Sequence, residues 1–225
     1  MLRRTVSVFA FVLAAIAVVV GIGRAQETPG LEDAATFMDA AFADICARDH
    51  GPDAPTGDAV YEINYRNSWQ DESEPDEVFK LFRMSCYMAA YNSGQIYLTR
   101  GWDAGFEILS FAEPAVTYDY ADEKEATLRS LPVVKGFSAT TTMTNSNFDP
   151  ETNTLTTFVK WRGLGDAWSA GTWSFDEGRF ILTRFVVDPT WSANLDPLPD
   201  GEIDLESFEV FPQVRVQPES NQAIR

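Results

Sequence analysis

The fold is decided by the stretch Val78–Arg100, VFKLFRMSCYMAAYNSGQIYLTR, which places two apolar, aromatic-rich strand patterns on either side of a polar turn. Asn92, Ser93 and Gly94 tolerate positive φ, so we expect the chain to reverse there and the two strands to pair as a hairpin. Cys86 lies in the first strand pattern. We expect much of the remaining chain to pack against this hairpin.

Further strand patterns lie on both sides of the hairpin. Tyr61, Ile63 and Tyr65 alternate with polar residues, as in a half-buried strand. Later strands are expected at 106–111, 116–120, 140–147, 154–161 and 179–187, with a turn at Asp176-Glu177-Gly178, a break at Glu113-Pro114 and one or two helical turns at 121–128. The pattern predicts a mainly β fold, an antiparallel sandwich or barrel-like sheet, with one N-terminal helix.

The helix is predicted at Leu31–Cys46, where apolar residues recur at the spacing of one helical face. Its last turn presents Cys46 beside Arg48 and His50, so an activated thiol is one interpretation. The chain has two cysteines, and in an exported protein a disulfide between Cys46 and Cys86 is favoured.

Export is predicted from residues 1–25. Arg3 and Arg4 precede an apolar run, and Gly23-Arg24-Ala25 has the small residues of a signal-peptide cleavage site. Cleavage near Ala25 predicts a periplasmic or secreted protein without a stable membrane span. An uncleaved anchor over residues 5–23 is the alternative. The mature chain is then one β-rich domain, 26–190, followed by an extended acidic and proline-rich tail, 191–225. At most a short strand of this tail is expected to dock, around Phe208–Phe211 and Val214–Val216.

The composition is strongly acidic, with a formal charge of −17 over 225 residues. Removing residues 1–25 takes away three arginines and no acid, which lowers the charge to about −20. Nucleic acids and anionic lipids are therefore poor partners, whereas a basic envelope protein would be attracted. Solubility in a crowded compartment explains the same charge without a partner.

Several chemical motifs fail when their spacing is checked. Calcium-loop patterns beginning at Asp149 and Asp196 lack a carboxylate at position twelve. Gly163-Leu164-Gly165 has no strand-to-helix context for a phosphate loop. His50 is the only histidine, which leaves zinc sites and acid–base catalysis without a second imidazole. The sequence predicts neither a cofactor nor a metal.

The best candidate contact residues are aromatic and polar side chains near two loops. Arg162 and Asp166, four residues apart across a tight loop, are expected to pair with each other. Aromatic residues and arginine contribute most to interface energetics. The candidate binding residues are Tyr91, Asn92, Trp161, Arg162, Asp166, Trp168 and Trp173. The alternative is that the tryptophans fill a core between two sheets.

A set of motifs over residues 78–190 supports a family resemblance: Cys86-x-x-x-Ala90-Tyr91-Asn92, Asn147-Phe148-Asp149-Pro150, Arg162-Gly163-Leu164-Gly165-Asp166 and Trp173-x-Phe175-Asp176-x-Gly178. In combination they resemble a family of exported proteobacterial proteins known only as a conserved domain of unknown function. The resemblance implies a periplasmic, mostly β protein and supplies no catalytic residue. It also implies family cysteines at two positions, which here are Ala167 and the neighbourhood of Trp191.

Two functions remain open on the sequence. The first is a non-catalytic binding or inhibitor module that presents aromatic and acidic loops to an envelope protein or glycan. The second is a hydrolase of an envelope polymer in which Asp166 works with Asp176 or Glu177 as acid and base. With 34 acidic residues, however, such carboxylate pairs arise from composition alone.

Overall fold

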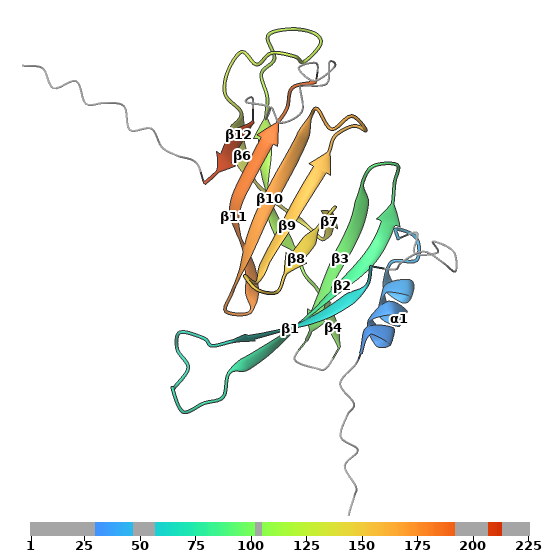
Figure 1. Cartoon of the computed structure of the whole chain (residues 1–225), viewed down its shortest axis with the longest axis vertical. Helices are drawn as coiled ribbons and strands as arrows, with labels where there is room; N and C mark the ends of the chain where they lie inside the picture. Colours follow the sequence, from blue (N-terminus) through green and yellow to red (C-terminus); the bar gives the residue numbers. More distant parts are fainter. Residues whose placement is uncertain (1–29, 47–56, 102–104, 192–206, 213–225) are drawn as a thin grey trace, which may run out of the picture.

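The computed structural model describes residues 30–46, 57–101, 105–191 and 207–212 and shows two open antiparallel sheets (Figure 1). The first sheet has the order β1 (Ala59–Tyr65), β2 (Glu77–Met88), β3 (Ser93–Arg100), β4 (Phe106–Ile108), and β7 (Thr142–Thr144) also pairs with β3. The second has the order β12 (Phe208–Phe211), β11 (Arg179–Asp188), β10 (Trp168–Asp176), β9 (Thr154–Lys160), β8 (Asn147–Asp149). A separate ribbon pairs β5 (Phe111–Thr117) with β6 (Val133–Thr140). The prediction of a mainly β fold with one helix is confirmed, and the sheets do not close into a barrel.

The main hydrophobic core is shared by residues of both sheets and of the ribbon. Successive side chains of a strand point to opposite faces of the sheet. The side chains on the faces that meet in this core are apolar. Phe79 from the first sheet and Phe175 and Phe180 from the second meet at ring-centroid distances of 5.0 to 6.4 Å. The rest of this core includes Ile63, Leu81, Tyr97, Phe111, Leu155, Trp173, Phe185 and Val187. Burial of aromatic area on this scale is the main stabilising contribution to the fold.

The hairpin of β2 and β3 forms as predicted, but its turn is shifted. The reversal lies at residues 89–92, where the Ala89 N–H donates to the Asn92 carbonyl at 2.8 Å. Ser93 and Gly94 already belong to β3, and neither has positive φ. Gly94 is required for a different reason: a Cβ there would lie 2.1 Å from a ring carbon of Tyr87. The glycine therefore permits close ring packing rather than the turn.

The helix α1 (Leu31–Ala41) packs outside the first sheet and is shorter than predicted. The chain leaves helical geometry at Phe42, and a turn closed by the Cys46 N–H to the Phe42 carbonyl brings Cys46 to the sheet. A second hydrophobic cluster lies beneath the helix and includes Ala34, Met38, Phe82, Met84, Ile96 and Leu98.

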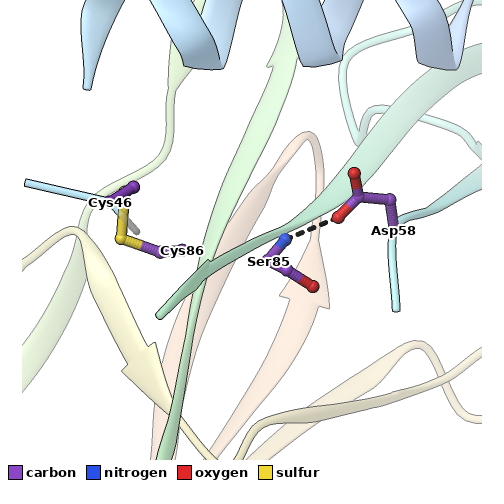
Figure 2. Close-up of a disulfide and its surroundings, with 4 residues drawn as sticks. All are labelled: Cys46, Asp58, Ser85 and Cys86. Carbon is purple, nitrogen blue, oxygen red and sulfur yellow. Dashed lines mark hydrogen bonds between the residues drawn. A yellow bond between two sulfur atoms is a disulfide. The ribbon is translucent and has the colours of Figure 1, made fainter. Parts of the chain in front are cut away.

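A disulfide joins Cys46 to Cys86 across 40 residues, as predicted from the sequence (Figure 2). Cys86 lies at an irregularity of β2 where the pairing with β3 shifts register. The backbone N–H of the neighbouring Ser85 donates to the Asp58 carboxylate at 2.7 Å. Closing a loop of this length stabilises the fold by about 4 kcal/mol in the chain-entropy model.

Other strand predictions are partly wrong. β5 runs through Glu113-Pro114, which had been expected to separate two strands, and Pro114 pairs with Phe137 of β6. No strand was expected at β6. Residues 121–128 form turns closed by a bridge between Tyr120 and Leu128 rather than a helix.

The β10–β11 turn is confirmed, with positive φ at Glu177 and Gly178. The strand expected at Phe208–Phe211 also forms and pairs with β11. The predicted signal peptide and most of the predicted tail lie outside the described residues.

Candidate functional sites

The candidate residues lie mainly in two loops, residues 89–92 and the β9–β10 loop, residues 161–167. The first loop is hydrogen-bonded to the end of β9, just before the second loop, although the two lie about 70 residues apart in the chain. β8 pairs only with Thr154–Thr156, so within the described chain the remainder of that edge of β9 has no strand beside it. The Asn92 side chain fills part of this gap: its amide donates to the Lys160 carbonyl at 2.8 Å and its oxygen accepts from the Lys160 N–H at 3.2 Å. Asn145 donates to the Phe158 carbonyl at 2.8 Å and to Asn92 at 2.7 Å. The two amides therefore act as substitutes for strand residues.

Arg162 and Asp166 form the ion pair expected from the sequence. The Arg162 Nε donates to Asp166 Oδ1 at 2.7 Å, and Nη2 donates both to Asp166 Oδ2 and to the Trp191 carbonyl. The guanidinium lies over the Trp191 ring, 5.3 Å from its centroid. Asp166 is 1% exposed, and the hydrogen bond from Arg162 holds the pKa of its carboxyl below the usual range. This pair anchors the end of β11 to the β9–β10 loop, and both groups are engaged with each other.

The three candidate tryptophans differ in their surroundings. Trp173 is 2% exposed, and its indole N–H donates to the Ala112 carbonyl at 2.9 Å, so it belongs to the core. Trp161 packs against the rings of Tyr118 and Trp191 at 5.5 and 5.9 Å. Trp168 packs against Phe158 at 5.2 Å. Of the seven candidates Tyr91 is the most open at 41%, and its ring lies against Gly163.

The most exposed tryptophan in the described chain is Trp69, with 76% of its surface accessible. It lies in the β1–β2 loop, residues 66–76, which extends beyond the sheets in Figure 1 and which we call the Trp69 loop. The loop also exposes a run of carboxylates: Asp71, Glu72, Glu74 and Asp76. The sequence analysis did not select Trp69, because nothing in its neighbours indicates that this indole points to solvent.

Arg66 stabilises the Trp69 loop by contacting other residues of the same loop. Its guanidinium donates to the carbonyls of Asp71 and Glu74 at 2.9 and 2.8 Å and pairs with the Asp76 carboxylate at 2.6 Å. At the base of the loop, the Ser68 N–H donates to a carboxylate oxygen of Glu177 at 2.7 Å, which ties the loop to the β10–β11 turn. The loop is therefore held in one shape while its tryptophan remains uncovered by described residues.

A third feature is a cleft of about 200 Å³, which we call the threonine cleft. β5, β7 and β9 line it, with the end of β6, and Trp173 of β10 contributes to its wall. Its polar lining consists of one carboxyl group and four hydroxyls: Glu113, Thr140, Thr142, Thr144 and Thr157. Gly171 keeps Trp173 flat against β10, since a Cβ on this glycine would lie 2.2 Å from the indole.

Glu113 is the one ionisable group of this lining. Its carboxyl forms no hydrogen bond or ion pair with any residue that the structure describes. Partial burial disfavours the charged form, so the pKa of Glu113 is raised above its ordinary value. The Glu113 charge in turn contributes to raising the pKa of Tyr118, although burial of that phenol is the larger cause.

A family model described as "Protein of unknown function (DUF1176)" matches residues 66–190. The chain belongs to the DUF1176 family. No curated protein and no solved structure matches it. The expected relationship to a family of unknown function is thus confirmed at that level.

The DUF1176 segment begins at the first residue of the Trp69 loop and ends two residues after β11. It contains the threonine cleft and the paired loops, whereas α1, Cys46 and β12 lie outside it. In the described part of this DUF1176 protein, no helix is long and apolar enough to cross a membrane. The same residues contain no cluster of three or more histidine, cysteine or acidic side chains suited to a metal ion.

The carboxylate pairs considered for a hydrolase are not brought together in the DUF1176 protein. Asp166 precedes β10, whereas Asp176 ends that strand and Glu177 follows it. Ten residues of extended chain span about 30 Å, far beyond the separation of roughly 5 to 9.5 Å that glycoside hydrolysis requires. Asp166 is moreover bound to Arg162, and Glu177 accepts from Ser68. These candidate carboxylates are therefore not arranged as an acid–base pair.

Proposed function

We propose that this protein is an exported, non-catalytic binding module whose Trp69 loop engages a basic protein of the cell envelope. The exposure of Trp69 within a braced, acidic loop is the observation that carries the proposal. A tryptophan and its surrounding charges at a protein surface are typical of interface hot spots. The disulfide and the apolar, arginine-led N-terminus support export to an oxidising compartment.

The contacts made by Arg66 favour tight binding because they order the loop before a partner arrives. A preformed loop loses less conformational entropy on association than a free one. The exposed carboxylates at 71, 72, 74 and 76, together with the charge of −17, attract a cationic partner and accelerate its encounter. An arginine or lysine of the partner would stack on the Trp69 indole and pair with these carboxylates.

The test is retention of envelope proteins on the immobilised protein and on two variants. The Trp69→Ala variant removes the indole, and Leu164→Ala is the matched control because Leu164 is 69% exposed on a different loop. We expect a basic protein to be retained by the unmodified protein and by Leu164→Ala, and to elute as salt is raised. The purified pair should then bind at least about tenfold more weakly to Trp69→Ala, measured by calorimetry.

Circular dichroism should show the same fold for both variants. Equal retention on Trp69→Ala, or retention that salt does not affect, would contradict the proposal. Export is checked separately by sequencing the N-terminus of protein from the periplasmic fraction, where we expect the chain to begin at Gln26.

A further inference from the structure

We infer that the threonine cleft binds a small, neutral, polyhydroxylated ligand, of the chemistry of one sugar ring or a cyclic polyol. The inference is independent of the Trp69 loop, which forms no part of the cleft lining. It stands on three properties of the cleft: fixed hydroxyls, one carboxyl without a described partner, and an apolar wall that includes Trp173.

The hydroxyls are held in place by bonds that leave part of each group free. Thr157 Oγ1 accepts from the Gly171 N–H at 3.2 Å, which leaves its own hydrogen available. Thr140 Oγ1 donates to the Thr142 carbonyl at 3.1 Å, which leaves its lone pairs available. A threonine hydroxyl is one donor and two acceptors. The lining therefore offers both donors and acceptors at fixed positions, as a ligand with several hydroxyl groups requires.

Glu113 adds a strong acceptor. A carboxylate that is partly removed from water is less well solvated than an exposed one, and a ligand that donates hydrogen bonds to it compensates for the lost solvation. Ligand hydroxyls are suitable donors. An anionic ligand is disfavoured by Glu113 and by the overall charge of −17. Protein sites for Ca²⁺ usually combine several carboxylate and carbonyl oxygens, whereas this lining supplies one carboxylate.

The size of the cleft and the apolar part of its lining narrow the class of ligand further. A volume of about 200 Å³ equals that of several water molecules at roughly 30 Å³ each, which suits one small ring rather than a chain. The apolar part of the lining consists of Met143, Val159 and Trp173. Apolar side chains of this kind contact the carbon skeleton of a sugar while its hydroxyls form hydrogen bonds.

The experiment follows amide chemical shifts of the 15N-labelled, oxidised full chain during titration with D-glucose, N-acetyl-D-glucosamine and myo-inositol. Concentrations up to about 100 mM detect a Kd in the millimolar range. Glu113→Gln removes the charge at constant shape, and Thr157→Val removes one cleft hydroxyl. Thr156→Val is the matched control, because Thr156 is the next residue of β9 and lies exposed on the opposite face.

We expect at least one of the three compounds to shift the amides of Glu113, Thr142 and Gly171. Glu113→Gln and Thr157→Val should each weaken that binding about tenfold, and Thr156→Val should leave it unchanged. Absence of shifts with all three compounds would overturn the inference. Binding by Glu113→Gln and Thr157→Val that is as tight as binding by the unmodified protein would overturn it as well. If methylammonium chloride, titrated in the same way, shifts these amides and none of the three compounds does, the ligand would be a cation rather than a neutral compound.

Discussion

The β9–β10 loop and the threonine cleft each contain one partly or fully buried carboxyl group, and the surroundings of the two groups are opposite. In the loop, Asp166 is buried against Arg162, and its pKa is lowered. In the cleft, Glu113 faces hydroxyl groups without a described partner, and its pKa is raised. Asp166 is already bound by Arg162 and is shielded from solvent, so it serves the fold. An unpaired one is costly to the fold unless something binds it, so Glu113 is the better candidate for function.

The largest effect is expected for Arg162→Met, which leaves Asp166 buried without its cation. Removing one partner of a fully buried pair costs about 3 kcal/mol or more, and the 35% exposure of the Arg162 side chain reduces the expected loss to roughly 2 to 3 kcal/mol of unfolding free energy. Arg184→Met is the matched control, because Arg184 pairs with Glu209 at the surface and should contribute less than about 1 kcal/mol. Urea denaturation measures both variants. Equal losses would mean that the Arg162–Asp166 pair is no more than a surface contact.

A loss of about 2 kcal/mol is expected for Asn92→Ala. The substitution removes the two hydrogen bonds to Lys160 and one to Asn145, and it leaves backbone groups of β9 unpaired. Asn147→Ala, at an exposed position with the same side chain, should change stability by less than about 0.5 kcal/mol. Urea denaturation again compares the two, and a small effect at Asn92 would show that water replaces its amide.

A smaller, pH-dependent effect distinguishes Asp166→Asn from the unmodified protein. Because the folded-state pKa of Asp166 is lowered, its stabilisation is present above the unfolded-state pKa of about 3.9 and is lost as pH falls through the folded-state pKa. At pH 7 the variant should therefore be less stable by about 1 to 2 kcal/mol. The difference should shrink below about pH 4. A constant difference across that range would exclude the ion pair as its cause.

The smallest effect has the opposite sign and concerns Glu113→Gln. The raised pKa means that the folded state holds the Glu113 proton more tightly than the unfolded state, so ionisation of Glu113 costs stability above the unfolded-state pKa of about 4.3. The variant should gain up to about 1 kcal/mol at pH 7 and nothing at pH 3. Thermal unfolding at the two pH values checks this gain. Destabilisation at pH 7 would reveal a partner for the Glu113 carboxylate in the folded protein.

The β9–β10 loop is formed by neighbouring residues, whereas the threonine cleft is formed by residues far apart in the chain. This difference explains which parts of the structure could be predicted from the sequence. The Arg162–Asp166 pair and the β10–β11 turn are local, and each depends on residue types a few positions apart. The disulfide was predictable because the chain offers only two cysteines. The turn of the first hairpin was misplaced because Gly94 is needed for packing against Tyr87, a use of glycine that resembles a turn signal.

The threonine cleft could not be predicted, since its lining comes from five strands between residues 113 and 173. A single threonine in a strand looks the same whether it faces solvent or a cleft. The alternation of threonines at 140, 142 and 144 is the one available signal, because it places three hydroxyls on one side of an extended chain. Pro114 concealed β5, as a proline inside a strand normally argues against pairing. The burial of Trp173 and the exposure of Trp69 depend on the packing of both sheets.

The amides of Asn92 and Asn145 on the open edge of β9 have a consequence for behaviour at high concentration. An uncovered strand edge is a template on which a second molecule can add its own strand, and repetition of that step leads to fibres. The two asparagines occupy backbone groups of Phe158 and Lys160, so a strand from a second molecule could not pair with those groups without displacing the amides. Even where their loss leaves the fold intact, it would lower the concentration at which the protein stays in solution.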